Sequence, residues 1–524
     1  MYTTNDRRPR WCVVLLLLWT KACAAASDPA AEPEPYRWIS LPIEVAGLPP
    51  RAAFVPVACP VDFGHVLRQS SVAGVIDERS LRLYRVLPDG SEVEEPVQFE
   101  AAHQPRLGPQ LLPGTAPGVS YVAEFHPEQA PPGLKQTGTL SWIARSDAEG
   151  GQRYRLQLGV PRGGRAIQVP FAPQNLRVFD EQGRATPIRS FPRMQIRPQW
   201  PLNGAVHVLD AQKLVTTYHV GPTPAGAEAR GKAESVAGPA LPGAPIRRPF
   251  FYPVNGPDGI GLTEFGKPHD PTGSHAHHYS LWIAHANVAG QDFWSERGGI
   301  IAHQQLEQLE DGPVSCRLVQ ATRWIAKGVD QLRERRRITV YRAAADFRLI
   351  DFELEFTAPR AEPVELGKTT FGFLAVRVAQ SMTPFDGGGE ILNARGDRNE
   401  QQAHLKRAEW LDQSGPIAPA SGELGAPGRK AGDAGSHPTA PARWGGIAVL
   451  DHPGNPNHPT VWHCRNDGWA GAAFNAEGPY AVRPGKPLRL RYRLCLHRGS
   501  AADARVADHY AAFAARPVVR LGVP

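Results

Sequence analysis

The chain has 524 residues, of which 42% are hydrophobic and 21% charged, and is long enough for two or three globular domains. Its formal net charge is +7, but no basic block with interleaved aromatic residues accompanies it, so nucleic acid is not an expected partner. Glycine and proline number 52 each, and proline is at roughly twice its usual share, which favours turns and loops over long helices.

The first residues predict an export signal. Arginines among the first ten residues precede an apolar run at 11–19, and Ala22-Cys23-Ala24 offers a small-residue cleavage site. The run is too short to cross roughly 30 Å of hydrocarbon as a helix. We therefore predict a signal peptide at 1–24, with a periplasmic or extracellular protein and no transmembrane segment in the mature chain. The alternative is a lipoprotein attached through Cys23.

Residues 37–221 contain short β-like runs separated by turn residues, a pattern that predicts an N-terminal antiparallel β-sandwich region. The predicted strands include Ala52–Val57, Ser80–Val86, Ser120–Phe125, Thr137–Ala144 and Arg153–Leu158. Residues 222–247 are rich in Gly, Ala and Pro, and we interpret them as a linker.

Residues 248–524 predict a second, larger β-sandwich, so the fold class is all-β. Three long runs alternate apolar and polar residues, at Val314–Ala326, Gln331–Ala343 and Phe347–Thr357. They exceed the usual strand length of five or six residues, which favours a large sandwich over a compact barrel. The segment 413–442 has the composition of a flexible insertion, and Ala501–Ala514 has the spacing of a helix.

Removal of the signal peptide leaves four cysteines, an even number that permits disulfides in an exported protein. They are Cys59, Cys316, Cys464 and Cys495. Three pairings are open, and Cys464 with Cys495 is favoured because both lie in predicted strands of the last domain. No C-x-x-C spacing indicates a structural zinc site.

Half of the eighteen histidines fall in two short stretches, the first between His269 and His303. Imidazole titrates near neutrality and is the commonest metal ligand. If the chain is extended here, His275 and His277 share one face about 7 Å apart, and His278 faces the opposite side. A metal, if one binds, would use His275 and His277. The alternative is that these histidines are hydrogen-bonded packing residues at a sheet edge.

The second stretch begins at Asp451-His452-Pro and ends at Asp467. In its predicted strand, His463 and Arg465 share one face, and a guanidinium beside an imidazole suits an oxygen-rich ligand. Trp462 lies on the other face. The alternative is a proline-stiffened loop whose histidines cap turns.

Two further segments offer carboxylates for acid–base work. One surrounds Arg398, and the other contains Glu409 and Trp410. For any single carboxylate the alternative is a solvated loop. No G-x-S-x-G, Walker or H-E-x-x-H motif is present.

Several motifs in one order resemble an exported bacterial family labelled "PmoA" or "methane oxygenase PmoA", over roughly residues 245–500. They include Arg248-Pro-Phe-Phe-Tyr-Pro, His269-Asp-Pro, Gly372-Phe-Leu-Ala-Val-Arg377, Arg407-Ala-Glu-Trp410 and Trp462-His463-x-Arg465-x-Asp-Gly. The resemblance implies a large sandwich similar to those of aldose mutarotases and some polysaccharide-active enzymes, by analogy of fold.

We therefore expect an exported carbohydrate-active protein, acting as a hydrolase, lyase or epimerase on a sugar or modified glycoside, with no cofactor required by the sequence. The alternatives are a non-catalytic glycan-binding protein and a metal-dependent oxidase. The expected catalytic residues are His277, His278, His463, Asp451, His452 and Glu409. The expected substrate-binding residues are His269, Asp270, Trp294, Arg398, Trp410, Trp462, Arg465 and Asp467. If the two clusters share a site, His277 or His278 should lie within about 10 Å of His463 or His452.

Overall fold

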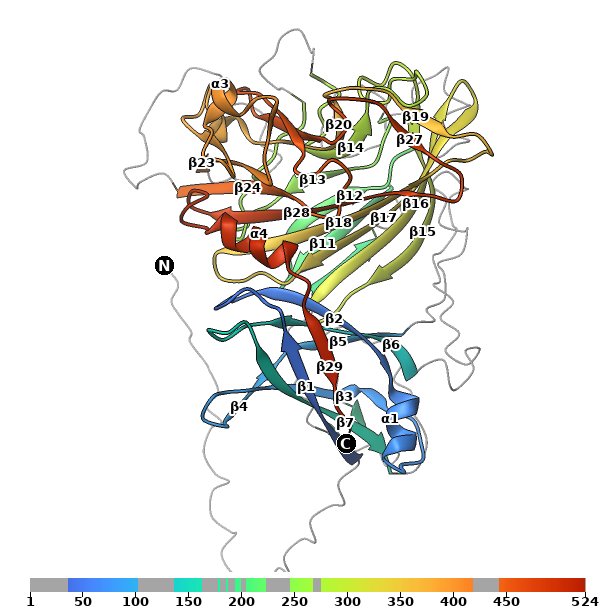
Figure 1. Ribbon diagram of the computed structural model, residues 1–524, viewed down its shortest axis with the longest axis vertical. Helices are drawn as coiled ribbons and strands as arrows, with labels where there is room; N and C mark the ends of the chain where they lie inside the picture. Colours follow the sequence, from blue (N-terminus) through green and yellow to red (C-terminus); the bar gives the residue numbers. More distant parts are fainter. Residues whose placement is uncertain are drawn as a thin grey trace, which may run out of the picture.

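A computed structural model shows two stacked β-sandwiches, with the smaller N-terminal one beneath the larger (Figure 1). The structure describes residues 36–101, 136–162, 178–179, 185–186, 194–198, 204–222, 246–266, 275–417 and 443–523. The predicted all-β class is confirmed, because the helices among these residues are short. The predicted signal peptide at 1–24, most of the linker and the predicted strand Ser120–Phe125 lie outside the described residues.

The N-terminal sandwich packs a five-stranded sheet against a three-stranded one. The larger sheet runs, in spatial order, β29 (Val518–Leu521), β1 (Tyr36–Ala46), β7 (Gln152–Pro161), β3 (Asp77–Val86) and β4 (Glu92–Glu95). The smaller sheet runs β2 (Val55–Asp62), β6 (Thr137–Ala144) and β5 (Val97–Ala101). Leu41 and Leu156 of one sheet and Trp142 of the other belong to one buried cluster, and α1 (Phe63–Gln69) adds Phe63 to it.

The large sandwich packs a nine-stranded sheet against an eight-stranded one. The nine-stranded sheet runs β10 (Met194–Pro198), β11 (Ala205–Asp210), β12 (Lys213–His219), β13 (Phe250–Val254), β14 (Leu281–His285), β20 (Gly372–Arg377), β26 (Trp469–Ala473), β25 (Val461–Cys464) and β22 (Lys406–Arg407). The eight-stranded sheet runs β15 (Ile300–Glu310), β16 (Ser315–Ala326), β17 (Val329–Tyr341), β18 (Phe347–Thr357), β28 (Leu488–Arg498), β24 (Arg443–Asp451), β23 (Trp410–Ile417) and β21 (Glu390–Asn393).

Short elements complete the described fold. They are two small strand pairs, β19 (Val364–Leu366) with β27 (Tyr480–Val482) and β8 (Val178–Phe179) with β9 (Ala185–Thr186), the 3-10 turn η3 (Gln380–Met382), and the helices α3 (Asn399–Ala403) and α4 (Val506–Ala514).

The three long alternating runs are confirmed as β16, β17 and β18. The turn between the first two is tight: Ala326 and Val329 are Cα partners, and Lys327 and Gly328 between them have φ of 53° and 73°. Two positive φ values in a two-residue loop match the right-handed twist of the flanking strands. The alternation buries one side chain in two against the nine-stranded sheet, so period-two patterning specifies the strands here.

The division between the two sandwiches differs from the boundaries predicted at 221 and 248. Strands β10–β12 pair through β12 with β13 in the nine-stranded sheet, and Met194 and Tyr218 join the core of the large sandwich. At the other end of the chain, β29 leaves the large sandwich and pairs with β1. Edge pairing between distant strands, which local composition does not encode, sets this division.

Two further boundaries need correction. The predicted insertion 413–442 begins too early, because β23 continues to Ile417, which is the Cα partner of Arg443 in β24. Residues 418–442 lie outside the described residues. The predicted helix 501–514 begins at Val506, after Arg505 with a φ of 52°. Its buried side packs on β24 and β28, which explains why β28 is buried on both faces in its second half.

The four cysteines are buried, and no disulfide joins them in the described residues. The favoured pair, Cys464 with Cys495, is therefore wrong. Cys464 lies in β25 of the nine-stranded sheet, whereas Cys495 lies in β28 of the eight-stranded sheet.

None of the described helices is long and apolar enough to cross a membrane.

Candidate functional site

Both histidine clusters contribute to one cavity of about 570 Å³ in the large sandwich, as expected. The cavity is lined by His275, His277, His278, Ala286, Asp292, Trp294, Ser295, Phe371, His463, Arg465, Asp467 and Trp469. Ring centroids of His278 and His463 lie 5.4 Å and 4.2 Å from that of Trp469. The two imidazoles are therefore within the about 10 Å that a sugar-sized ligand can bridge.

Four neighbouring strands bring these residues together, in the order β14-β20-β26-β25. Leu281 at the start of β14 pairs with Val376 near the end of β20, and Arg377 pairs with Trp469 at the start of β26. The β26–β25 hairpin turns at Gly468, whose φ of 103° suits glycine, and places His463 opposite Gly471. The cavity spans these strands, because its lining includes the histidines before β14 and also Ala286 after β14 and Phe371 before β20.

The conformation of the first cluster differs from the expected strand. Residues 275–277 form a turn closed by a 2.9 Å hydrogen bond from the His278 amide to the His275 carbonyl, and β14 begins only at Leu281. The turn gathers the three rings: the centroid of His278 lies 5.0 Å from that of His275 and 4.6 Å from that of His277. All three therefore face the cavity, whereas an extended chain would turn His278 away.

Trp469 is the centre of an aromatic wall. Its ring centroid lies 5.4 Å from that of Trp294 and 5.9 Å from that of Phe371, and it is nearly parallel to Phe371. Trp294 and Trp469 are almost fully buried, whereas Phe371 is 37% exposed at the mouth. Flat apolar faces of this kind offer stacking surface to a ligand with one apolar side.

Hydrogen bonds determine which nitrogen of His278 carries its proton. Arg377, 1% exposed at the end of β20, donates through Nε and Nη2 to the His278 Nδ1 at 3.1 and 3.0 Å. A guanidinium can only donate, so Nδ1 accepts and the proton of the neutral ring is on Nε2. Burial and the adjacent Arg377 hold the pKa of His278 well below its usual range. Arg377 also bonds the carbonyl of Asp467 at 2.8 Å, which ties this histidine to the β26–β25 hairpin.

His463 has the opposite tautomer. Its Nδ1 lies 3.3 Å from the Thr370 carbonyl oxygen and 3.2 Å from the Thr370 hydroxyl. The carbonyl can only accept and the hydroxyl can accept too, so a proton on Nδ1 satisfies both contacts and leaves the lone pair on Nε2. Burial, reinforced by the neighbouring His404, lowers the pKa of His463 to about 3. At neutral pH His278 and His463 are therefore both uncharged, one with Nε2–H as donor and the other with Nε2 as acceptor.

The other polar groups of the cavity have defined roles. The pKa of His277 is lowered to about 4, first by burial and then by Arg248. Asp292 accepts from the Trp294 and Ser295 amides at 2.8 and 3.0 Å, so it shapes the loop that carries the indole. Arg465, half exposed, pairs with Glu400 at 2.7 Å, which leaves its guanidinium at the rim.

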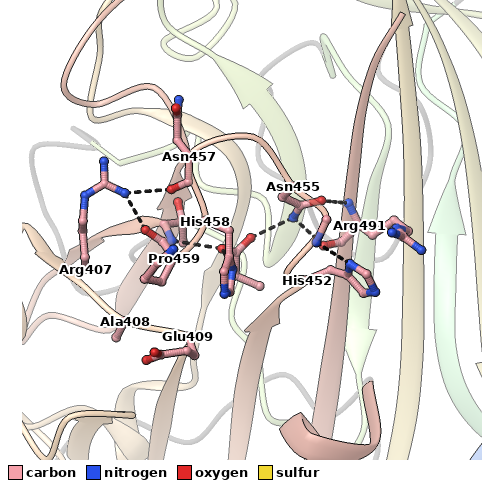
Figure 2. A network of polar contacts seen from close by, with 12 residues as sticks. Arg407, Ala408, Glu409, His452, Asn455, Asn457, His458, Pro459 and Arg491 are labelled. Atoms are coloured by element: carbon pink, nitrogen blue, oxygen red, sulfur yellow. Dashed lines mark hydrogen bonds and ion pairs between the residues drawn. The ribbon is translucent and has the colours of Figure 1, made fainter. Parts of the chain in front are cut away.

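The loop after β24 does not reach this cavity, which corrects the expectation for Asp451 and His452. Asp451 accepts from the Asn455 side chain at 2.7 Å, from His458 Nδ1 at 2.7 Å and from the Thr460 amide at 2.9 Å. Figure 2 shows this network between Arg407 on one side and Arg491 on the other. Asp451 is 1% exposed, so it organises the loop, as the proline-stiffened alternative predicts.

Several other expected residues also lie elsewhere. Glu409 pairs weakly with Arg395 at 3.4 Å, and Arg398 forms an ion pair with Glu390. Trp410 packs in the cluster beneath α4, and Trp462 is fully buried with its Nε1 donating to the Ala408 carbonyl at 2.8 Å. None of these four side chains lines the cavity. His269 and Asp270 lie outside the described residues.

Three residues of the site were not among those expected from the sequence. Two line the cavity, Phe371 and Trp469, and the third, Arg377, bonds His278. Arg377 had a usable signal: it ends the wholly apolar run Phe373–Val376, and a charged residue closing a buried strand needs a specific partner. No such signal in the sequence marks Phe371, because it lies in a loop.

The described residues contain no group of three or more His, Cys, Asp or Glu side chains arranged to hold a metal, so His275 and His277 form no such group there.

The chain belongs to a family of unknown function, DUF6807, whose model matches residues 205–511. The match begins at β11, in agreement with the sheet that places this strand in the large sandwich. The family description names no activity, and the resemblance to the "PmoA" family stays a prediction.

No curated protein matches the sequence. Among solved structures, the chain is similar to an alpha-mannosidase from Enterococcus faecalis V583, with 9% identity and a TM-score of 0.33. The similarity covers 92% of this chain and 46% of that one, so the chain spans about half the length of the mannosidase.

Proposed function

We propose that the cavity binds a sugar ring and that the protein is an exported enzyme acting on a carbohydrate. The observation that carries the proposal is the combination, in one cavity, of an aromatic wall with two uncharged imidazoles of opposite tautomer. The indole of Trp469 would stack on the C–H face of a sugar, while Arg465 at the rim would bind its oxygens. A volume of about 570 Å³ suits a ligand of this size.

The chemistry that we propose is proton transfer at the bound sugar. Nε2 of His463 would accept a proton from a hydroxyl or an acidic carbon, and Nε2–H of His278 would donate to an oxygen on which charge develops. The cavity carboxylates are already engaged, Asp292 by two backbone amides and Asp467 by Arg377. Hydrolysis by two carboxyl groups is therefore a weaker fit than ring opening, epimerisation or elimination.

A non-catalytic glycan-binding pocket is the second candidate. The pKa of His463 near 3 favours it, because an imidazole this reluctant to protonate is a weak base at neutral pH. Both candidates use the aromatic wall, but only the enzyme needs the two imidazoles to move a proton. A metal-dependent oxidase is the third, and elemental analysis of the purified protein tests it.

Titration of the full chain with a panel of neutral and acidic mono- and oligosaccharides tests the proposal, with calorimetry for binding and product analysis for turnover. We expect Trp469→Leu to weaken binding at least about tenfold. Trp38→Leu, in the N-terminal sandwich, is the matched control and should bind normally. His463→Gln should bind but lose turnover. Binding without turnover in the native chain would favour the second candidate. Absence of binding to any saccharide would contradict both.

A further inference from the structure

A second cavity, of about 240 Å³, lies at the junction of the two sandwiches and shares no residue with the first. Pro56 of β2 contributes from the N-terminal sandwich, Arg491 and Arg493 from β28, Phe513 from α4, and Pro517 from the segment that leads from α4 to β29. Most of the surface that faces this cavity is polar, although half of its lining residues are Pro, Phe or Ala. Such a cavity needs a polar occupant.

Arg493 lines this cavity and has one unmet donor. It is only 4% exposed, and its Nε and Nη2 donate to the two carboxylate oxygens of Asp351 at 2.6 and 2.8 Å. The remaining nitrogen, Nη1, is buried and has no hydrogen-bond partner in the described part of the chain. The guanidinium stacks 4.6 Å over the Phe513 ring, which restricts its movement. A buried charged donor without an acceptor costs free energy, so an acceptor supplied by a ligand would stabilise it.

Two further donors belong to the same cavity. His452 Nδ1 accepts from the Gly454 amide at 2.8 Å, so the proton of the neutral ring is on Nε2. Arg491 uses its backbone amide to bind Asn455, and no described carboxylate forms an ion pair with its guanidinium. Figure 2 shows the side chains of His452 and Arg491 together, at the end of the loop network remote from Arg407.

The charges around the cavity favour an anion. Of the two lining carboxylates, Asp351 is occupied by Arg493 and by the Tyr341 hydroxyl at 3.0 Å, and Glu353 lies 4.0 Å from Arg337 on the neighbouring strand. Burial, with Arg491, His458, Arg493 and Arg516, lowers the pKa of His452 to about 4, so the surroundings of this ring are electropositive.

We propose that this cavity binds a small tetrahedral oxyanion, phosphate or sulfate, through Arg491, Arg493 Nη1 and His452 Nε2. The volume admits such an ion with a few waters but not a larger ester lying wholly inside. All three proposed ligands belong to the large sandwich, because Pro56 of β2 lines the cavity without an N–H to donate. Binding to the folded chain alone raises its stability, so phosphate or sulfate at this site would stabilise the fold.

Calorimetric titration and melting of the full chain test this, with sodium phosphate, sulfate and acetate at one ionic strength. We expect phosphate or sulfate to raise the melting midpoint by about 2 °C or more and acetate to have little effect. Arg491→Met should weaken oxyanion binding at least about tenfold. Arg489→Met is the matched control, because Arg489 is two residues away on β28, exposed and paired with Glu355; it should bind normally.

His452→Phe is the second variant, because it retains the ring while removing the Nε2 donor; it should also weaken oxyanion binding, even if Arg491→Met fails to fold. If acetate raised the melting midpoint as much as phosphate or sulfate does, the site would not be specific for a tetrahedral oxyanion. If Arg489→Met weakened oxyanion binding as much as Arg491→Met does, the effect would be general screening of positive charge. Absence of binding by either oxyanion would overturn the proposal.

Discussion

At the scale of single residues, Arg377 determines the state of the candidate site. Its guanidinium donates to His278 and to Asp467, so one buried side chain sets a histidine tautomer and anchors a hairpin. His463 obtains the opposite tautomer from a backbone carbonyl, without a charged partner. The two imidazoles therefore differ in which nitrogen carries the proton, because of what each Nδ1 contacts.

Arg377→Met should raise the pKa of His278, because the guanidinium is the largest cause of its depression after burial. The value should remain below about 6.5, since burial persists. Histidine ring titration by NMR measures this. His463 serves as the internal control, because Arg377 is not among the causes of its shift. A His278 pKa that does not move would show that the guanidinium is unimportant.

At the scale of elements, the alternating pattern specifies strands where one face is buried and fails where both are. β18 was predicted at its observed limits, because every second side chain enters the core. β23 was partly mistaken for an insertion, because Gln413, Ser414 and Gly415 resemble a loop, although they are buried between β21 and β24. Polar and small residues that are buried by neighbouring strands give no periodic signal.

Replacement of 418–442 by Asn-Gly should change the melting midpoint little. Ile417 and Arg443 are Cα partners, so a two-residue turn can close the β23–β24 hairpin. Differential scanning calorimetry measures the midpoint. Extending the deletion to 414–446 is the control, since it removes paired strand residues and should destabilise the chain strongly. A loss of more than about 10 °C in the shorter deletion would mean that the segment is packed.

At the scale of the whole molecule, buried histidines are the largest set among the described groups whose pKa is strongly shifted. Burial lowers the pKa of His219, His285 and His303 to about 4 each, and His278, His452 and His509 are shifted in the same direction. Two groups have raised pKa values instead. Asp412 raises the pKa of His497, and burial raises that of Glu310 to about 7.

We therefore expect stability to fall as the pH falls from about 6.5 to about 4. In this window the unfolded chain binds protons that the folded chain does not, so protonation favours unfolding. Above about pH 6.5 the histidines are neutral in both states, and their contribution is complete. A single histidine buried like His285 loses about 1.4 kcal/mol per pH unit at most. Melting curves from pH 7.5 to 4.5 measure the effect.

His303→Gln should reduce the slope of that dependence by about one proton, because His303 is 1% exposed and uncharged in the fold. His65→Gln, on the exposed side of α1, is the control and should leave the slope unchanged. A midpoint that is constant between pH 7 and pH 5 would contradict the prediction.

The sequence by itself determined the all-β class, the long strands of the large sandwich and the two segments that form the candidate site. These depend on local patterning, since a half-buried strand repeats every two residues and an unusual concentration of histidine is visible directly. Only the tertiary structure decided which histidines meet. His452 and His463 are close in sequence, yet the loop between them passes from β24 in one sheet to β25 in the other. Strand order depends on pairing between distant segments, so His463 joins His278 and Arg377, while His452 joins Arg491 at the second cavity.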